Sequence, residues 1–171
     1  MSVDRIQFSL MQSSYETYRT DTQPCKNPAI DNQCAVRLSL ALVRNGFDFE
    51  NFPDQRRIHQ GRTGCRLGDE SHVVGANELH RYLGTVWDAG LRGSGSDIRA
   101  QIASTPGIVY FDSCFHRHTD AEGRNTGNHI DLWNGAQYYN QILDIGAGGT
   151  ARARTDLFSR ASYVRFFWLP S

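Results

Sequence analysis

A cysteine at the predicted start of a helix and a histidine in a predicted strand are the residue types that a cysteine hydrolase needs. Cys34 lies in the segment NQCAVRLS, which is typical of the beginning of a helix. His129 lies in the segment NHIDLWNG, which predicts a strand that runs into a tight turn. A helix N-terminus favours the reactive thiolate, and a nearby imidazole can accept and return its proton. The two residues therefore predict attack by a thiol on a carbonyl group.

Such a site also needs a group that orients the histidine. If Asn134 and Gly135 form a two-residue hairpin turn, Asn140 lies directly opposite His129 on the next strand. Opposed side chains share one face of the sheet, with Cβ atoms about 4.5–5.5 Å apart, so the Asn140 amide could orient the imidazole. Asp131 shares that face by alternation along the strand and is the alternative orienting group.

Helix geometry adds candidates next to the cysteine. The backbone N–H of Cys34 points out of the first helical turn and is the expected donor to the oxyanion. Gln33, directly before it, is a supporting candidate. Each residue also has a structural interpretation, because a free helical cysteine is most often part of the core and a single strand histidine has no stronger claim to catalysis. The combination of helix start, histidine and orienting group is what favours catalysis.

The elements that must position these residues divide the chain into two halves. Helical spacing of apolar residues predicts helices over 32–45, 75–87 and 96–103. Buried or alternating patterns then predict strands over 108–111, 129–133, 136–145 and 163–169. The polar stretch 47–72 predicts a long irregular connection. This order indicates a single α+β domain over residues 1–171, with N-terminal helices packed on a C-terminal antiparallel β-sheet.

Composition argues against several other classes of protein. The 171 residues include 18 lysines and arginines and 18 aspartates and glutamates, without a basic run interleaved with aromatics, so no nucleic-acid partner is expected. The longest apolar stretches fall far short of the roughly 20 residues that span a bilayer, so no membrane insertion is expected. Residues 1–7 lack the pattern of a signal peptide, so general secretion is not expected.

The four cysteines show neither a CxxC pair nor the spacing of a zinc site. Cys25 and Cys65 both lie in loop-like sequence and are the predicted disulfide. Four reduced cysteines are the open alternative. A separate group of metal-ligating types occurs at alternate positions, namely Asp112, Cys114, His116 and His118. Nothing in the sequence holds this polar run extended, so we expect neither a metal nor another cofactor.

Two motifs resemble those of a known family. Residues 33–39 read QCAVRLS and residues 127–135 read GNHIDLWNG, and both are similar to sequence blocks of the fourth family of type VI secretion amidase effectors. The resemblance covers most of the chain, with a looser match over 47–72. It implies a papain-like fold of the NlpC/P60 type. It also implies an endopeptidase that cuts peptidoglycan stem peptides between D-glutamate and meso-diaminopimelate.

The resemblance assigns roles to particular residues. Cys34 falls on the nucleophile and His129 on the base. The third family position, an aspartate, is Asn140 here, which can fix the imidazole tautomer without supplying a charge. The stem peptide would lie beside Trp133, with Arg37 near its carboxylates. The structural interpretations are a core or pocket-wall position for Trp133 and a surface salt bridge for Arg37.

Partners and location also follow from the resemblance. Such an effector is made in the bacterial cytoplasm, passed by the type VI secretion apparatus into the periplasm of a target cell, and inhibited by a cognate immunity protein. A disulfide would suit the oxidising periplasm. Because Asn140 departs from the family pattern, a catalytically silent module that binds the cell wall or a partner on the same fold is the alternative function.

Overall fold

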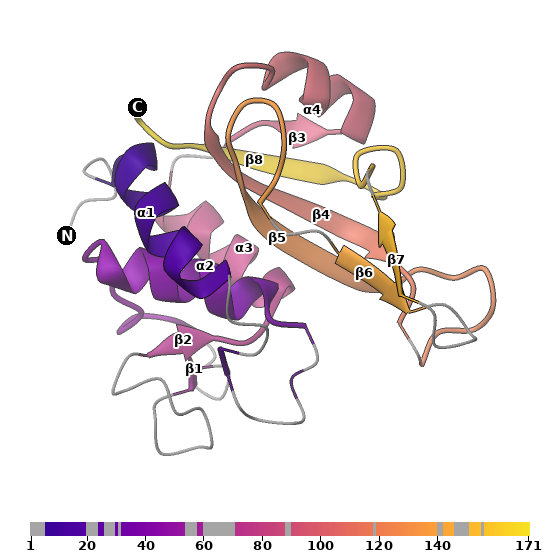
Figure 1. Cartoon of the computed structure of the whole chain (residues 1–171), viewed down its shortest axis with the longest axis horizontal. Helices are drawn as coiled ribbons and strands as arrows, with labels where there is room; N and C mark the ends of the chain where they lie inside the picture. Colours follow the sequence, from indigo (N-terminus) through magenta and orange to yellow (C-terminus); the bar gives the residue numbers. More distant parts are fainter. Residues whose placement is uncertain are drawn as a thin grey trace. The chain divides into compact units, whose positions relative to one another are not determined.

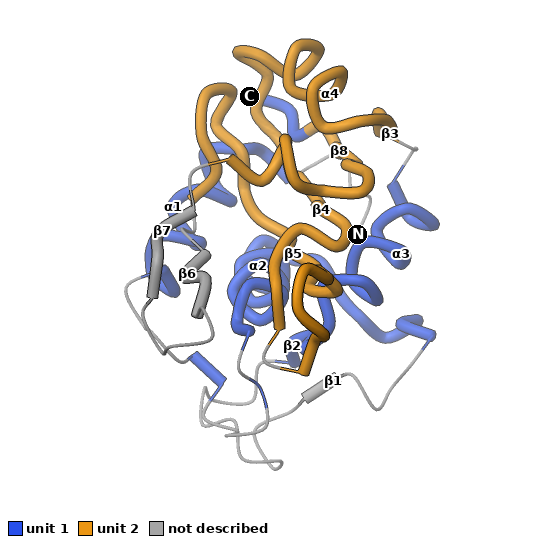
Figure 2. The backbone as a smooth tube through the Cα atoms, turned by 90° about the vertical axis from the view of Figure 1, so that its right-hand side faces the viewer, with its two compact units in different colours: residues 1–89, 169–171 blue, residues 90–168 orange. Residues whose placement is uncertain are grey.

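The chain divides into two compact units in the computed structural model. Residues 1–89 with 169–171 form the first unit, and residues 90–168 form the second (Figure 2). Each unit has its own cluster of buried apolar residues. The structure describes residues 6–19, 24–25, 30, 32–53, 58–59, 71–87, 90–117, 119–139, 142–145, 151–154 and 156–171.

The first unit is mainly helical. It contains α1 (Phe8–Arg19), α2 (Cys34–Arg44), α3 (Ala76–Val86) and an antiparallel pair of short strands, β1 (Ile58–His59) and β2 (His72–Val73) (Figure 1). Both α1 and α3 pack against α2, and β2 also contacts it. The helix that carries the candidate nucleophile is therefore the one that the rest of the first unit surrounds.

α2 follows the sequence pattern that predicted it. Ala35, Leu38 and Leu42 recur at helical spacing, and all three are buried. The helix ends at Arg44, and Gly46 adopts a φ of +81°, a left-handed conformation that glycine takes without steric cost. The observed helix lies within the predicted range 32–45, which confirms the prediction for this element.

The middle of α2 is fixed to its neighbours by one hydroxyl and one apolar cluster. The Ser39 hydroxyl accepts the Val73 N–H at 2.9 Å, which joins α2 to β2. It also donates to the carbonyl of Val36 at 3.1 Å. The buried cluster beside it consists of Tyr18, Cys25, Val36 and Leu40. These contacts hold the helix from the side, whereas its first turn is held by the residues before it.

Two features of the first unit were not predicted. α1 was not predicted, although its buried residues Met11, Tyr15 and Tyr18 recur at helical spacing. Residues 47–53 are irregular, as expected for the start of the 47–72 connection, but they are not merely polar surface. Their aromatic rings are buried and pack with rings of α3 and the residue after it, in a cluster of Phe47, Phe49, Phe52, Tyr82 and Trp87.

The second unit is an antiparallel sheet with one short helix. Its four-stranded sheet has the order β3-β8-β4-β5, formed by β3 (Arg92–Gly93), β8 (Val164–Trp168), β4 (Gly107–Phe115) and β5 (Gly127–Trp133) (Figure 1). α4 (Gly95–Gln101) begins after Ser94, whose hydroxyl accepts the Asp97 N–H at 3.3 Å. A separate antiparallel pair consists of β6 (Ile142–Ile145) and β7 (Ala151–Arg154).

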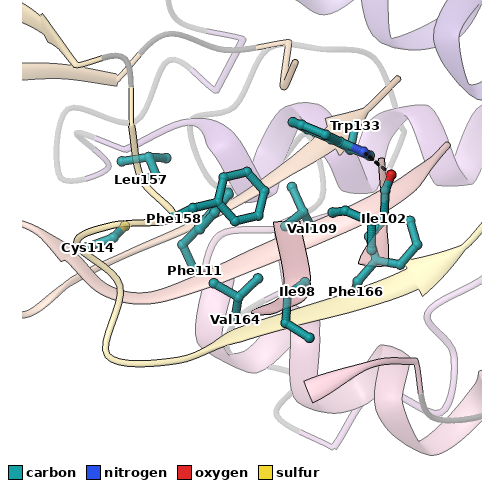
Figure 3. Close-up of a cluster of buried hydrophobic side chains, with 10 residues drawn as sticks. All are labelled: Ile98, Ile102, Val109, Phe111, Cys114, Trp133, Leu157, Phe158, Val164 and Phe166. Carbon is teal, nitrogen blue, oxygen red and sulfur yellow. Dashed lines mark hydrogen bonds between the residues drawn. The ribbon is translucent and has the colours of Figure 1, made fainter. Parts of the chain in front are cut away.

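Alternation along the strands builds the core of the second unit. Val109 and Phe111 of β4 point to the same side as Val164 and Phe166 of β8, as period-two geometry requires. Figure 3 shows these side chains with those that α4 and the loop before β8 add, namely Ile98, Ile102, Leu157 and Phe158, and with Cys114 and Trp133. All of these side chains are buried, and the strand pairing places His129 and Asp131 on the same face. The other face of the sheet is buried as well, by Ile108, Tyr110, Ile130, Leu132 and Phe167.

The predicted two-residue turn at Asn134 and Gly135 is wrong. The Asn134 N–H donates to the Gln137 carbonyl at 3.1 Å, and Trp133 bridges to Tyr138, so the loop spans Asn134 to Gln137. The reason is the Asn134 side chain, whose Oδ1 accepts two backbone N–H groups, those of residues 136 and 137, at 2.9 and 2.8 Å. This local hydrogen bonding favours a wider turn than the Asn-Gly dipeptide alone predicts.

The wider loop removes the argument that placed Asn140 opposite His129. In the sheet, the strand partner of His129 is Phe111 of β4. The predicted strand over 136–145 is only partly present, because β6 begins at Ile142 and pairs with β7. Asn140 itself lies outside the described residues.

Candidate active site

Cys34 is the first residue of α2. Its thiol is free, and only 2% of the residue is exposed. The Cys34 N–H, expected to donate to the oxyanion, donates instead to the Asn32 Oδ1 at 3.1 Å. The Asn32 side chain thus accepts the first N–H of the helix, and the role of this N–H toward an oxyanion stays a prediction. The signal was present in the sequence, because asparagine just before a helix is a common capping residue.

Gln33 ends in a carboxamide that bonds entirely to backbone groups. Its Oε1 accepts the Cys25 N–H at 2.9 Å, and its Nε2 donates to the Cys25 carbonyl at 3.1 Å and to the Ile30 carbonyl at 2.7 Å. The residue is 4% exposed. The sequence marked Gln33 as a supporting candidate but gave no indication of these partners, which precede it by three and eight residues.

His129 and Asp131 form a buried pair on β5. The His129 Nε2 lies 3.2 Å from the Asp131 Oδ2, and the other carboxylate oxygen accepts the Leu132 N–H at 2.8 Å. Both side chains are almost completely buried. Residues two apart on a strand share a face, which is why the sequence could anticipate this pair. If Nε2–H donates to the carboxylate, the basic lone pair of the neutral ring lies on Nδ1.

Aromatic rings surround the imidazole. Phe111 stacks on it with ring centroids 6.3 Å apart, and Tyr138 meets it edge-on at 6.4 Å. Burial raises the pKa of the Tyr138 hydroxyl above its ordinary value, with smaller contributions from the charges of Asp156 and Asp131. These apolar neighbours limit the orientations open to the His129 ring.

A strained residue lies beside the histidine strand. Ser113 of β4 has a φ of +50°, at a point where the pairing of β4 with β5 shifts register between Phe111 and Phe115. The Ser113 N–H donates to the Asn128 Oδ1 at 2.9 Å. Asn128, directly before His129, therefore fixes this bulge, and no sequence pattern indicated the contact.

Trp133 and Arg37, expected near the substrate, are both held by structural contacts. The Trp133 indole N–H donates to the Ile102 carbonyl at 3.2 Å, within the apolar cluster of the second unit (Figure 3). Arg37 is partly buried, and its Nε donates to the Tyr18 carbonyl at 3.3 Å, which ties α2 to α1. The contact of Trp133 favours its structural interpretation, whereas this contact of Arg37 is a hydrogen bond to a backbone carbonyl and not the expected surface salt bridge.

The remaining cysteines and the metal-ligating types also have definite positions. Cys25 is disulfide-bonded, whereas Cys34 and Cys114 form no disulfide. Cys65 lies outside the described residues, so its pairing with Cys25 stays a prediction. Cys114 is buried in the core, and the His116 Nδ1 lies 2.8 Å from the Arg124 carbonyl. His118 is outside the described residues.

Within the described part of the chain, no group of three or more His, Cys, Asp or Glu residues is arranged to hold a metal ion. No helix in the same residues is long and apolar enough to cross a membrane.

Comparison with known proteins decides the family. Residues 30–167 match the family model described as type VI secretion system (T6SS), amidase effector protein 4 (Tae4), and this range contains Cys34, His129 and Asp131. The chain belongs to this family. The Tae4 family consists of amidase effectors of the type VI secretion system, so the prediction of a hydrolase and the resemblance noted in the two motifs are both confirmed.

Solved Tae4 structures have the same fold. The type VI effector Tae4 from Enterobacter cloacae is 17% identical, with 99% of each chain covered and a TM-score of 0.62. The Tae4–Tai4 effector–immunity complex from Salmonella Typhimurium gives 17% identity, 97% of this chain and 99% of that chain covered, and a TM-score of 0.65. The Tae4–Tai4 complex from Enterobacter cloacae gives 18% identity, with 96% of this chain and 99% of that chain covered and a TM-score of 0.60. The predicted α+β class is therefore confirmed.

No curated protein sequence matches this Tae4 chain.

Proposed function

We propose that Cys34, His129 and Asp131 hydrolyse the amide bond between D-glutamate and meso-diaminopimelate in peptidoglycan stem peptides. The observation that carries these roles is the buried pair formed by the His129 Nε2 and the Asp131 Oδ2, 3.2 Å apart, in a chain of the Tae4 family whose free cysteine begins a helix. A carboxylate on one imidazole nitrogen fixes the tautomer in which the other nitrogen is basic. Such an imidazole is suited to activating a thiol.

The reaction would proceed through a thioester. Nδ1 of His129 accepts the proton of the Cys34 thiol, and the sulfur attacks the D-glutamyl carbonyl carbon. When the C–N bond breaks, His129 returns the proton to the amine of diaminopimelate, which leaves. Water then attacks the thioester while His129 accepts a proton from it, the C–S bond breaks, and the proton returns to the thiol. Asp131 stabilises the imidazolium that forms twice in this cycle.

The start of α2 would stabilise the negative charge on the carbonyl oxygen. N–H groups of the first helical turn point out of the helix and interact favourably with an anion. Because the Asn32 Oδ1 accepts the Cys34 N–H at 3.1 Å, this donor becomes available to the oxyanion only when the Asn32 side chain turns away. Asn32 is an exposed residue.

We also propose a cognate immunity protein and action in the periplasm of a target cell. The Tae4 structures from Enterobacter cloacae and Salmonella Typhimurium include complexes with the immunity protein Tai4, which supports the first proposal. The disulfide at Cys25 supports the second, because the periplasm is oxidising and the cytosol is not.

Mass spectrometry of muropeptides tests the proposed reaction. Purified sacculi are incubated with the wild-type protein, with Cys34→Ala, and with Cys114→Ala as a matched control that removes a buried thiol of the second unit. We expect fragments split between D-glutamate and diaminopimelate with the wild type and the control, and none with Cys34→Ala. Unchanged muropeptides with a folded wild-type protein would instead favour a module that binds the cell wall without cutting it.

A further inference from the structure

The carboxamide of Gln33 has no donor left for a substrate. A glutamine side chain carries two N–H donors on its nitrogen and accepts at its oxygen. In this structure, Nε2 donates to the Cys25 carbonyl at 3.1 Å and to the Ile30 carbonyl at 2.7 Å, and Oε1 accepts the Cys25 N–H at 2.9 Å. Both donors are used within the chain, so Gln33 is not arranged to stabilise an oxyanion.

These bonds instead join two segments at the start of α2. Gln33 immediately precedes Cys34, and its own carbonyl accepts the Arg37 N–H at 3.0 Å in the first turn of the helix. Its side chain reaches back to the backbone of Cys25, a fully buried and disulfide-bonded residue. One residue thus bonds forward into the helix with its backbone and backward to a cross-linked segment with its side chain.

The cluster beneath these bonds makes the anchor rigid. Cys25 packs with Tyr18 of α1 and with Val36 and Leu40 of α2, so the segment that Gln33 holds is itself part of the buried core of the first unit. A group held by a locked rotamer and by several hydrogen bonds keeps its neighbour in place. For a nucleophile, a displacement of about 1 Å can cost on the order of 10²-fold in rate.

We propose that Gln33 is a positioning residue for the Cys34 thiol: its carboxamide fixes the first turn of α2 to the backbone of Cys25 and Ile30. The proposal rests on the proposed role of Cys34 as the nucleophile. In this role, Gln33 holds the nucleophile in place and does not contact the substrate. Loss of the side chain should therefore slow the chemical step and leave substrate binding largely intact.

The test compares Gln33→Met and Gln33→Ala with the wild type and with Gln101→Met. Methionine has a similar length and makes none of the three hydrogen bonds, whereas alanine leaves space for water to bond to the backbone groups of Cys25 and Ile30. Gln101 is an exposed residue of α4, so Gln101→Met controls for the same exchange of side chains elsewhere. Thermal unfolding identifies which variants are folded.

Two readouts are measured on each folded variant: kcat and KM on a purified stem peptide, and the rate at which iodoacetamide alkylates Cys34 at neutral pH, assigned by peptide mapping. We expect kcat to fall on the order of 10²-fold with KM little changed, and alkylation to slow, for both Gln33 variants. Gln101→Met should behave as the wild type. A role in contacting substrate would instead change KM, or lower kcat without changing alkylation.

The outcomes separate this proposal from the proposed function. If the wild type cleaves the stem peptide and the folded Gln33 variants keep its kcat and alkylation rate, the positioning role is overturned and the proposed function stands. A fall in kcat with unchanged alkylation, or a rise in KM, overturns it as well. If neither variant folds, Gln33 serves folding alone and the proposal is wrong. A wild type that cleaves nothing overturns the proposed function first.

Discussion

At the scale of single residues, the carboxylate of Asp131 determines how His129 can act. One carboxylate oxygen lies 3.2 Å from the His129 Nε2 and the other accepts the Leu132 N–H, so the orientation of the carboxylate is fixed from the backbone. The resemblance to the family placed the orienting role at Asn140, but the side chain of Asn140 carries no charge. The structure therefore gives a specific reason to test Asp131 first.

Asp131→Asn should nearly abolish the reaction. The amide has the same shape but can donate to Nε2, which favours the wrong imidazole tautomer, and it lacks the charge that stabilises imidazolium. We expect kcat on a purified stem peptide to fall by up to about 10⁴-fold. Asp48→Asn, a change at an exposed aspartate of the first unit, is the matched control and should leave kcat unchanged.

Asn140→Asp distinguishes the two orienting residues. If Asp131 orients His129, Asn140→Asp should not restore activity to the Asp131→Asn protein. An Asp131→Asn protein with undiminished kcat, or one that Asn140→Asp rescues, would show that position 140 carries the role and would contradict the assignment made here.

At the scale of elements, Asp120 organises the loop between β4 and β5. Its carboxylate accepts the N–H groups of Arg117 and Thr126 at 2.8 and 2.9 Å, and the Thr126 hydroxyl donates to it as well. The Arg117 N–H and the Thr126 hydroxyl are the main causes that lower the pKa of Asp120 to about 2. This loop leads directly into the strand of His129, so its order affects how that strand begins.

The stability of this loop should depend on acid in a defined range. Because the folded pKa is about 2 and that of an unfolded aspartate is about 3.9, the contribution of the Asp120 carboxylate is fully present above about pH 4 and is lost as pH falls through about 2. Asp120→Asn should therefore lower the unfolding midpoint at neutral pH, and the difference from wild type should shrink between pH 4 and 2.

Unfolding curves measured from pH 7 to 2 check this prediction. Glu122→Gln, at an exposed position of the same loop, is the control and should track the wild type throughout. A difference between Asp120→Asn and wild type that persists unchanged at pH 2, or that is absent at pH 7, would show that the carboxylate does not hold the loop.

Local patterns predicted the elements far better than the pairing between them. α2 and α3 were predicted to within about two residues because apolar spacing and capping residues are short-range signals. The pair of His129 and Asp131 could be anticipated from alternation alone. The expected pairing of Asn140 with His129 depended on the length of the turn. That length is set by the Asn134 side chain, which accepts two backbone N–H groups, a contact that the preference of Asn-Gly for two-residue turns does not include. The contacts of Gln33, with backbone groups three and eight residues before it, follow no recognised local motif and were not predicted.

At the scale of the whole molecule, the disulfide at Cys25 suits a protein that acts in an oxidising compartment. The sequence predicted one cysteine peptidase domain over residues 1–171, and the matched range 30–167 includes residues of both compact units. We propose that both units are needed for activity, because the first carries Cys34 and the second His129.

Toxicity should depend on compartment. When the protein is expressed in a Gram-negative host behind a periplasmic leader sequence, we expect lysis, because the peptidoglycan substrate lies there. The same chain without the leader, and the leader-directed Cys34→Ala protein, should leave growth normal. Optical density and microscopy after induction provide the readout. Lysis by the Cys34→Ala protein, or equal toxicity without the leader, would contradict a periplasmic peptidoglycan hydrolase.

Trapping the covalent intermediate tests the central claim most directly. The wild-type protein is mixed with a purified stem peptide, quenched in acid during turnover, and analysed by intact-mass and peptide-mapping mass spectrometry. We predict a thioester between Cys34 and the peptide fragment that ends in D-glutamate, with free diaminopimelate-containing product released in parallel. Cleavage that continues in Cys34→Ala, or an acyl group found on another residue, would contradict the account.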